Sequence, residues 1–276
     1  MSRLIAYFGN EPERLACALS PARTALYSRS AQPQGWGLGF VQGGDVLLQK
    51  RPRAAAREID FFSLSKDLRA EALIGRVGVS EDGNTPAEDA DPFRFRSWLF
   101  ASMGGAAGFE AVRERLLESV PDFLRRNIRG RSPSEHIFHL FLAFLHDGGI
   151  LETASPPSDA VQRALHASVA FVDKLLDATG GTATRLALCA TNGRCLIASV
   201  RAHPMQYLEV AGISDCLVCR ARAEIDGDER RVAHEGLRAV VLESNANTEG
   251  RPGWQKVPSD AALVVGADRI PSIVVD

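Results

Sequence analysis

The chain has 276 residues, a 45% hydrophobic composition and a formal net charge of -2. This is enough apolar material for one large core, and the near-neutral charge gives no strong field to attract nucleic acid or an anionic membrane. Because no stretch reaches the roughly 18 to 20 apolar residues of a membrane span, and no signal peptide is evident, we expect a cytoplasmic protein with a single domain over 1–276.

Short apolar segments near the start of the chain predict strands. "RLIAYFG" at 3–9 is the first, and 35–51 reads as two strands joined by a Gly-Gly-Asp turn. The segment 71–80 reads as another strand, and 93–102 alternates well enough for a strand. Six further strand-like segments follow Gly180.

Helical patterns occupy the middle of the chain, at 109–120, 132–149 and 158–181. The second is apolar nearly all round, so we expect a buried helix that is capped by Ser132 or Ser134 and ended by two glycines. Strands, then helices, then strands predict an α+β fold of antiparallel sheets with helices on their outer faces.

The five cysteines are odd in number and irregular in spacing, which argues against a disulfide framework. "DCLVCR" contains a lone CxxC, whereas a structural zinc site needs four ligands and no second CxxC exists. A two-residue turn at Asn192-Gly193 would pair Ala190 with Cys195 and place Cys189 and Cys195 on opposite faces of a sheet. We therefore expect ordinary thiols and no metal or cofactor.

Three histidines lie on the predicted buried helix "HIFHLFLAFLH", at His136, His139 and His146. The first two are one turn apart, so a metal-binding face is one interpretation. No nearby carboxylate pattern completes such a site, and a buried helix that tolerates histidine is the interpretation we favour.

Six segments, taken in order, resemble the class II glutamine amidotransferases of the N-terminal nucleophile fold. "MSRLIAYFGN" is similar to their start, Met-Cys-Arg-Leu-Leu-Gly-Tyr-Leu-Gly, and "GWGLGF" to a Gly-Trp-Gly-Ile-Gly-Trp strand. "DPFRFRSWLFASMGG" looks like His-Pro-Phe, then Trp and Phe-Ala-His-Asn-Gly, and "GRSPSEHIFHLFLAFL" like Gly-x-Thr-Asp-Ser-Glu and its helix. "ALSPARTALYSRS" and "VVLESNANTEGRPGWQKVPSDAALVV" complete the series. The resemblance, closest to small single-domain bacterial members, implies a four-layer αββα sandwich.

The resemblance also implies a mechanism. In the family, a terminal Cys attacks the side-chain amide of glutamine, with its own α-amine as base. An Asn side chain and a Gly backbone N–H stabilise the oxyanion, an Arg pairs with the substrate α-carboxylate, and an Asp holds its α-ammonium.

The polar catalytic positions of the family are replaced in this chain. Arg76 is one residue away from the position of the family Arg, which on a strand is the opposite face. Only the oxyanion glycine is retained, because methionine has no useful oxyanion donor. The matching positions, from nucleophile to ammonium site, are Ser2, Val77, Ser102, Met103, Gly104 and Pro133.

We therefore expect a retained fold without glutaminase activity, acting as a binding or regulatory subunit. Its partner would be another protein or a second copy of the chain. A pocket walled by Val77 and Met103 would accept a small apolar or uncharged ligand. Two alternatives remain open: an amidohydrolase that uses Ser2 on a substrate other than free glutamine, and a small-molecule sensor that uses the remodelled pocket.

Overall fold

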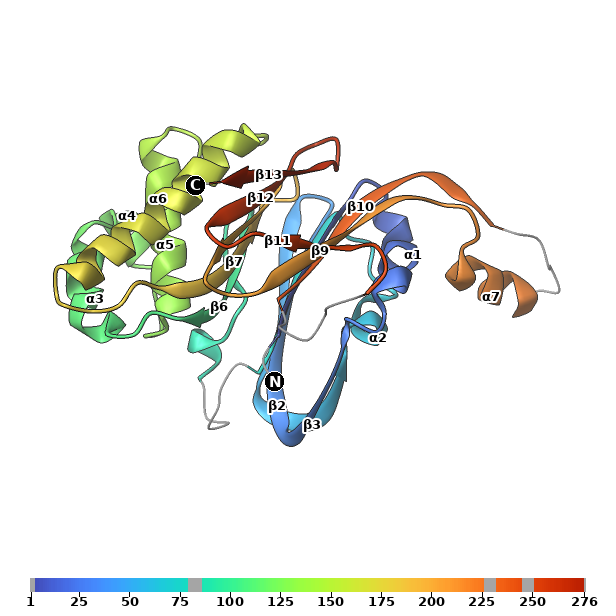
Figure 1. The fold of residues 1–276 in the computed structure, drawn as a ribbon, viewed down its shortest axis with the longest axis horizontal. Coiled ribbons are helices and arrows are strands. Elements are labelled where there is room, and N and C mark those ends of the chain that lie inside the picture. The colour runs from blue at the N-terminus through green and yellow to red at the C-terminus, as the bar shows by residue number, and fades with distance from the viewer. Residues whose placement is uncertain (1–2, 79–85, 226–231, 245–250, 276) are drawn as a thin grey trace.

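The computed structural model describes residues 3–78, 86–225, 232–244 and 251–275, and its elements form four layers (Figure 1). Two antiparallel sheets stack against each other, and helices cover the outer face of each. The α+β fold and the αββα sandwich predicted from the sequence are confirmed. Within the described part of the chain, no helix is both long enough and apolar enough to cross a membrane.

The first sheet has seven strands, with the N-terminal strand at its centre. Its strands, in spatial order, are β11 (Trp254–Val257), β9 (Met205–Ile213), β10 (His234–Ser244), β1 (Arg3–Gly9), β4 (Ala72–Val77), β2 (Tyr27–Gln42) and β3 (Asp45–Asp60). Because β1 pairs with β10 on one side and β4 on the other, the start of the chain is held by segments far away in sequence.

The second sheet has six strands, all paired antiparallel. In spatial order they are β13 (Pro271–Val275), β12 (Ala261–Val265), β8 (Leu196–Arg201), β7 (Arg185–Thr191), β6 (Trp98–Gly105) and β5 (Phe93–Phe95). Strand β6 carries the residues aligned with the family's oxyanion site, Met103 and Gly104.

Helices form the two outer layers. The first sheet is covered by α1 (Leu15–Leu19), α2 (Phe61–Ser65) and α7 (Leu217–Ile225). The second sheet is covered by α3 (Phe109–Glu118), α4 (Asp122–Arg125), α5 (Pro133–Asp147) and α6 (Ser158–Asp177). Short 3-10 turns lie at Pro12–Arg14, Ser20–Ala22 and Ala87–Asp89.

Side-chain alternation along the strands divides the core into three apolar layers. On β1, Leu4, Ala6 and Phe8 face the second sheet, whereas Ile5 and Tyr7 face the helices. All five side chains are almost fully buried. A strand buried on both faces loses its polar alternation, which explains why "LIAYF" is continuously apolar.

Local signals in the sequence agree with the observed helix and turn boundaries. Ser132 caps α5, because its hydroxyl accepts a 3.1 Å hydrogen bond from the backbone N–H of Glu135. Gly43 and Gly44, both with positive φ, join β2 to β3 as the Gly-Gly-Asp signal predicts.

The predicted pairing around Asn192-Gly193 is wrong by two residues. Ala190 pairs with Ile197 rather than Cys195, and Thr191 pairs with Leu196. Cys195 belongs to the turn, where the Asn192 side chain accepts hydrogen bonds from the backbone N–H groups of residues 194 and 195. This Asx turn adds two residues to the connection, a possibility that the Asn-Gly signal alone does not reveal.

Candidate functional site

The start of β1 is fixed by polar contacts on both sides. The backbone N–H of Leu4 donates to the Ser244 hydroxyl at 3.2 Å. The Arg3 guanidinium donates to the carbonyl oxygens of Ala25 and Tyr27, at 3.0 and 2.7 Å, and lies 3.4 Å from the buried carboxylate of Glu243. Ser2, which aligns with the family nucleophile, lies outside the described residues.

The arrangement of Arg76 and Val77 corrects the expected pocket. Val77 is fully buried on the helix-covered face of β4, beside Trp36 and Phe61, so it is not a wall shared with Met103. Arg76 is the residue that faces the second sheet, because strand neighbours point to opposite sides. The alignment correctly placed Arg76 and Val77 on opposite faces of the strand. It expected Val77 on the face between the sheets, where the structure has Arg76.

Arg76 is held by the backbone of both sheets. Its Nε donates a 3.0 Å hydrogen bond to the carbonyl oxygen of Ser102 on β6, and a second guanidinium nitrogen donates to the carbonyl oxygen of Val77. Burial lowers the pKa of Arg76, and the nearby carboxylate of Asp91 partly opposes that shift.

Asp91 supplies the negative charge at this site. It is 7% exposed, and its Oδ1 accepts hydrogen bonds from the backbone N–H of Ser102 at 2.9 Å and from the Ser134 hydroxyl at 2.6 Å. Burial raises the pKa of Asp91, whereas Arg76, these two hydrogen bonds and Lys50 lower it. Asp91 thus links the loop before β5, strand β6 and the start of α5.

At the positions aligned with the family's oxyanion site, the available side chains are poor hydrogen-bond donors or already donate to another group. The Ser244 hydroxyl, which accepts the Leu4 N–H, donates to the Met103 sulfur at 2.9 Å. Gly104 has a φ of 104°, and an added Cβ would lie 1.9 Å from the carbonyl oxygen of Arg185. The backbone therefore requires glycine here for structural reasons alone.

The loop before α5 is stabilised by carboxylates that accept backbone hydrogen bonds. Pro133 is the first residue of α5, where a missing N–H costs nothing. Glu135 accepts from the N–H groups of Arg129 and Gly130, at 3.0 and 2.8 Å, and Asp89 accepts from Ser132 at 2.7 Å. The family's Asp position is therefore a helix start without a carboxylate.

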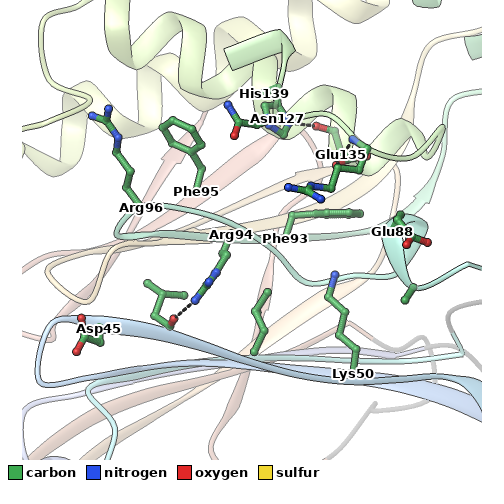
Figure 2. A pocket seen from close by; sticks show the side chains of 14 residues that line it. Asp45, Lys50, Glu88, Phe93, Arg94, Phe95, Arg96, Asn127, Glu135 and His139 are labelled. Carbon is green, nitrogen blue, oxygen red and sulfur yellow. Dashed lines mark hydrogen bonds between the residues drawn. The ribbon is translucent and has the colours of Figure 1, made fainter. Parts of the chain in front are cut away.

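A cavity of about 790 Å³ lies beside this cluster, between β3, β5 and the start of α5 (Figure 2). Figure 2 shows Lys50 extending from β3 toward Phe93, with its Nζ 4.8 Å from the ring centroid. Burial lowers the pKa of Lys50, and Asp91, Glu135 and Glu88 oppose the shift. The cavity therefore combines aromatic faces with charges of both signs.

His136 and His139 of α5 make hydrogen bonds within the helix and pack against aromatic rings, as structural side chains do. The Nδ1 atoms of His136 and His139 each lie 2.9 Å from the carbonyl oxygen four residues earlier. Aromatic rings surround both, including Phe109 and Phe95. His139 also lines the cavity, and burial lowers its pKa to about 4. Neither belongs to the group of convergent metal-ligating side chains found in the described residues.

The cysteines differ from the sequence-based expectation. Cys189 and Cys195 do face opposite sides of the second sheet. However, Cys17, Cys216 and Cys219 converge with His234, a grouping that their spacing in the sequence did not indicate. The CxxC is joined not by a second CxxC but by Cys17 and His234, which the fold brings to it.

The comparisons with known proteins agree with this architecture, although no protein-family profile matches the chain. A probable glutamine amidotransferase of Saccharomyces cerevisiae is 23% identical over 160 residues, which are 51% of this chain and 45% of the relative. The match thus spans less than half of that protein.

Two solved structures cover nearly the whole chain. A class II glutamine aminotransferase domain protein from Silicibacter pomeroyi has a TM-score of 0.62 at 17% identity, covering 99% of this chain and 98% of that chain. The chain has the class II glutamine amidotransferase fold. A Pseudomonas aeruginosa structure, named as a predicted glutamine amidotransferase, has a TM-score of 0.58 at 14% identity and covers 99% and 100%.

Within this amidotransferase fold, the sequence alignment missed the polar partners of the site. Asp91 stands where the family has the His of His-Pro-Phe, and Ser134 follows the replaced Asp position. The replacement of His by Asp91 and the retained Ser134 were the available signal. Their meaning depends on the contact between them, which joins segments 43 residues apart.

Proposed function

We propose that this protein is a glutamine amidotransferase-like subunit that has no glutaminase activity and that binds or regulates another protein. The observation that carries the proposal is that the protein itself engages Arg76. Its guanidinium donates to two backbone carbonyls, and the Asp91 carboxylate lies near enough to interact with it electrostatically.

A free glutamine would meet competition at this cluster. In the family, as the resemblance implies, an Arg receives the substrate α-carboxylate. Here a second carboxylate beside Arg76 would compete with Asp91, which already interacts with Arg76 and accepts hydrogen bonds from Ser102 and Ser134. The substrate would also lose hydration without gaining a free cation.

The oxyanion and ammonium positions support the same conclusion. The Met103 side chain has no N–H or O–H to stabilise an oxyanion, and the Ser244 hydroxyl beside it already donates to its sulfur. Pro133 has no carboxylate for an α-ammonium group. Loss of a single oxyanion donor costs about 10²- to 10³-fold in rate, so the combined losses would remove useful turnover.

An exposed apolar strand supports the proposed protein contact. β13 is the edge of the second sheet, and its apolar side chains Ile273, Val274 and Val275 are 36%, 40% and 74% exposed. An open edge with exposed apolar side chains is a surface that pairs readily with another strand. We propose that a second copy of the chain pairs here. Light scattering after size exclusion should then show a dimer that Val275→Lys weakens.

The cavity favours a second candidate function, that of a small-molecule sensor. Its volume of about 790 Å³ falls in the range of ligand sites, roughly 300 to 1,000 Å³. Phe93 and Phe95 offer apolar faces, and the charged side chains around them include both signs. A small uncharged ligand with one apolar face suits this lining better than a zwitterionic amino acid does.

Two measurements on the purified protein test the leading proposal. Ammonia release from glutamine should not exceed that of buffer, and calorimetric titration with glutamine or glutamate should show no saturable binding. Turnover that disappears in Ser2→Ala would reject the proposal and support the Ser2 amidohydrolase. Stoichiometric glutamine binding that Arg76→Met abolishes would show instead that Arg76 remains available to substrate.

A further inference from the structure

Three cysteines and one histidine meet at one point on the helix-covered side of the first sheet. Cys17 lies on α1, Cys216 directly precedes α7, Cys219 lies in its first turn, and His234 begins β10. The Sγ atoms of Cys17 and Cys219 are 3.6 Å apart, and the Cys219 Sγ is 3.3 Å from the His234 Nε2. The four ligand atoms all lie within 4.8 Å of one another.

We propose that these four side chains bind a zinc ion as a closed, structural site. Tetrahedral zinc with Zn–S distances of about 2.3 Å and Zn–N distances of about 2.0 Å requires S–S and S–N separations of about 3.8 and 3.5 Å. The two measured separations are within a few tenths of an ångström of these values. The Cys17–Cys219 separation is also far longer than a disulfide bond, about 2.05 Å.

The donor set determines the class of metal. Thiolate and imidazole ligands suit zinc rather than magnesium or calcium, which prefer oxygen. Four protein ligands leave no coordination position for water or substrate, so the site is structural and not catalytic. Cys17, Cys216 and His234 are 3%, 1% and 8% exposed, so the metal would be shielded from solvent.

A positively charged side chain beside the cluster would also balance the charge of the bound metal and its ligands. Three thiolates and a neutral imidazole around a divalent ion carry a net charge of -1. The guanidinium of Arg14 lies 3.6 Å from the Cys219 Sγ, where it donates to the sulfur and offsets that charge. Donors that surround metal ligands in this way orient them and strengthen binding.

The backbone on both sides of the CxxC is already organised for the site. The N–H of Cys216 donates to the carbonyl oxygen of Val232 at 2.8 Å, and the N–H of Arg220 donates to that of Cys216 at 2.9 Å. The first contact joins the start of α7 to the segment before β10. The second continues the helical turn that places both cysteine side chains on one side.

The consequence of metal binding is a cross-link between distant parts of the chain. α7 lies in the excursion between β9 and β10, toward one end of the molecule (Figure 1). Cys17 follows β1, about 200 residues earlier, as the separation of 202 between Cys17 and Cys219 records. Zinc would therefore fasten α7 to α1, and hence to the central strand of the first sheet.

Metal analysis of the purified, reduced protein tests the proposal directly. Plasma mass spectrometry should find one zinc per chain without added metal. After removal of zinc by a chelator, cobalt(II) should bind with equal stoichiometry and give the visible bands of tetrahedral cobalt with thiolate charge transfer. The melting temperature should fall by about 10 °C or more on zinc removal and recover on zinc addition.

Variants with a matched control assign the ligands. Cys216→Ser and His234→Gln should lose zinc and the cobalt spectrum, whereas Cys189→Ala, at a thiol buried between the sheets, should retain both. If the ligand variants do not fold, the cobalt titration of the wild-type chain decides alone. Absence of zinc together with absence of the cobalt bands would overturn the proposal. A Cys17–Cys219 disulfide found by mass spectrometry of the unreduced protein would also overturn it.

Discussion

Arg76 Nε donates a 3.0 Å hydrogen bond to the carbonyl oxygen of Ser102, so a guanidinium on β4 bridges the first sheet to β6 of the second. The same Ser102 donates its backbone N–H to Asp91. Cation, peptide unit and carboxylate therefore form one connected cluster between the sheets. This connection makes the site a structural element in its own right, and it leads to the first prediction.

Removing the Asp91 carboxylate should destabilise the fold. Asp91→Ala leaves the buried hydroxyl of Ser134 and the N–H of Ser102 without their acceptor and leaves Arg76 without its counter-charge. We expect a loss of about 3 kcal/mol in the free energy of unfolding. Urea denaturation measures it. The exposed residue Asp45 is the control, since Asp45→Ala should change stability by less than about 0.5 kcal/mol. Equal effects of the two variants would contradict the assignment.

Restoring the family nucleophile should not restore glutaminase activity. Ser2→Cys supplies a thiol, but Met103 still offers no oxyanion donor and Arg76 remains engaged by the protein itself. Without an oriented substrate, a better nucleophile has little effect. A coupled assay for ammonia should find no turnover above that of the parent chain. Substantial activity in the single variant would show that the retained residues suffice for glutamine binding.

His139 should make the stability of the protein depend on pH. Burial lowers its pKa from 6.5 to about 4, so below pH 6.5 the unfolded chain binds a proton that the folded chain excludes. Stability therefore falls as pH decreases, with about 2 kcal/mol lost between pH 7 and pH 5. His139→Phe, which suits the aromatic surroundings, should remove this part of the dependence.

The measurement for His139 is urea denaturation of both proteins at several pH values. His146 lies at the exposed end of the same helix, and His146→Phe is the matched control. If His139→Phe keeps the full dependence of the wild-type chain, the titration originates elsewhere.

Adjacent glycines at the end of β6 should respond very differently to alanine. Gly104 has a φ of 104°, and its Cβ would lie 1.9 Å from the Arg185 carbonyl oxygen, whereas nothing lies within 4 Å of a Cβ on Gly105. We expect Gly104→Ala to cost about 3 kcal/mol or more and Gly105→Ala less than about 0.5 kcal/mol. Thermal unfolding of both variants tests this. Similar melting temperatures would mean that the backbone at 104 adapts easily.

Much of the fold follows from interactions between residues close in sequence. The α5 helix was predictable because its serine cap, its first-turn proline and its terminal glycines all act within a few residues. The β2–β3 connection was predictable because paired glycines adopt positive φ without cost. The stripe of apolar residues on α6 is also local, and its members Val161, Leu165, Val169, Val172 and Leu176 are all buried.

The site depended on contacts that no local pattern encodes. Whether Arg76 or Val77 faces the second sheet follows from the pairing of β4 with β1 and β2, and a shift of one residue reverses it. Asp91 can accept a hydrogen bond from Ser134 only because the fold brings the loop before β5 to the start of α5.

The sequence by itself determined the order of strands and helices and the resemblance to an amidotransferase, and it predicted that polar positions of the family are replaced. Only the tertiary structure decided which side chains share a site. Cys17 and His234 join the CxxC although α1 and β10 lie at opposite ends of the chain. They meet because β1 and β10 are neighbours in the first sheet, and strand pairing places residues together without regard to their separation in sequence.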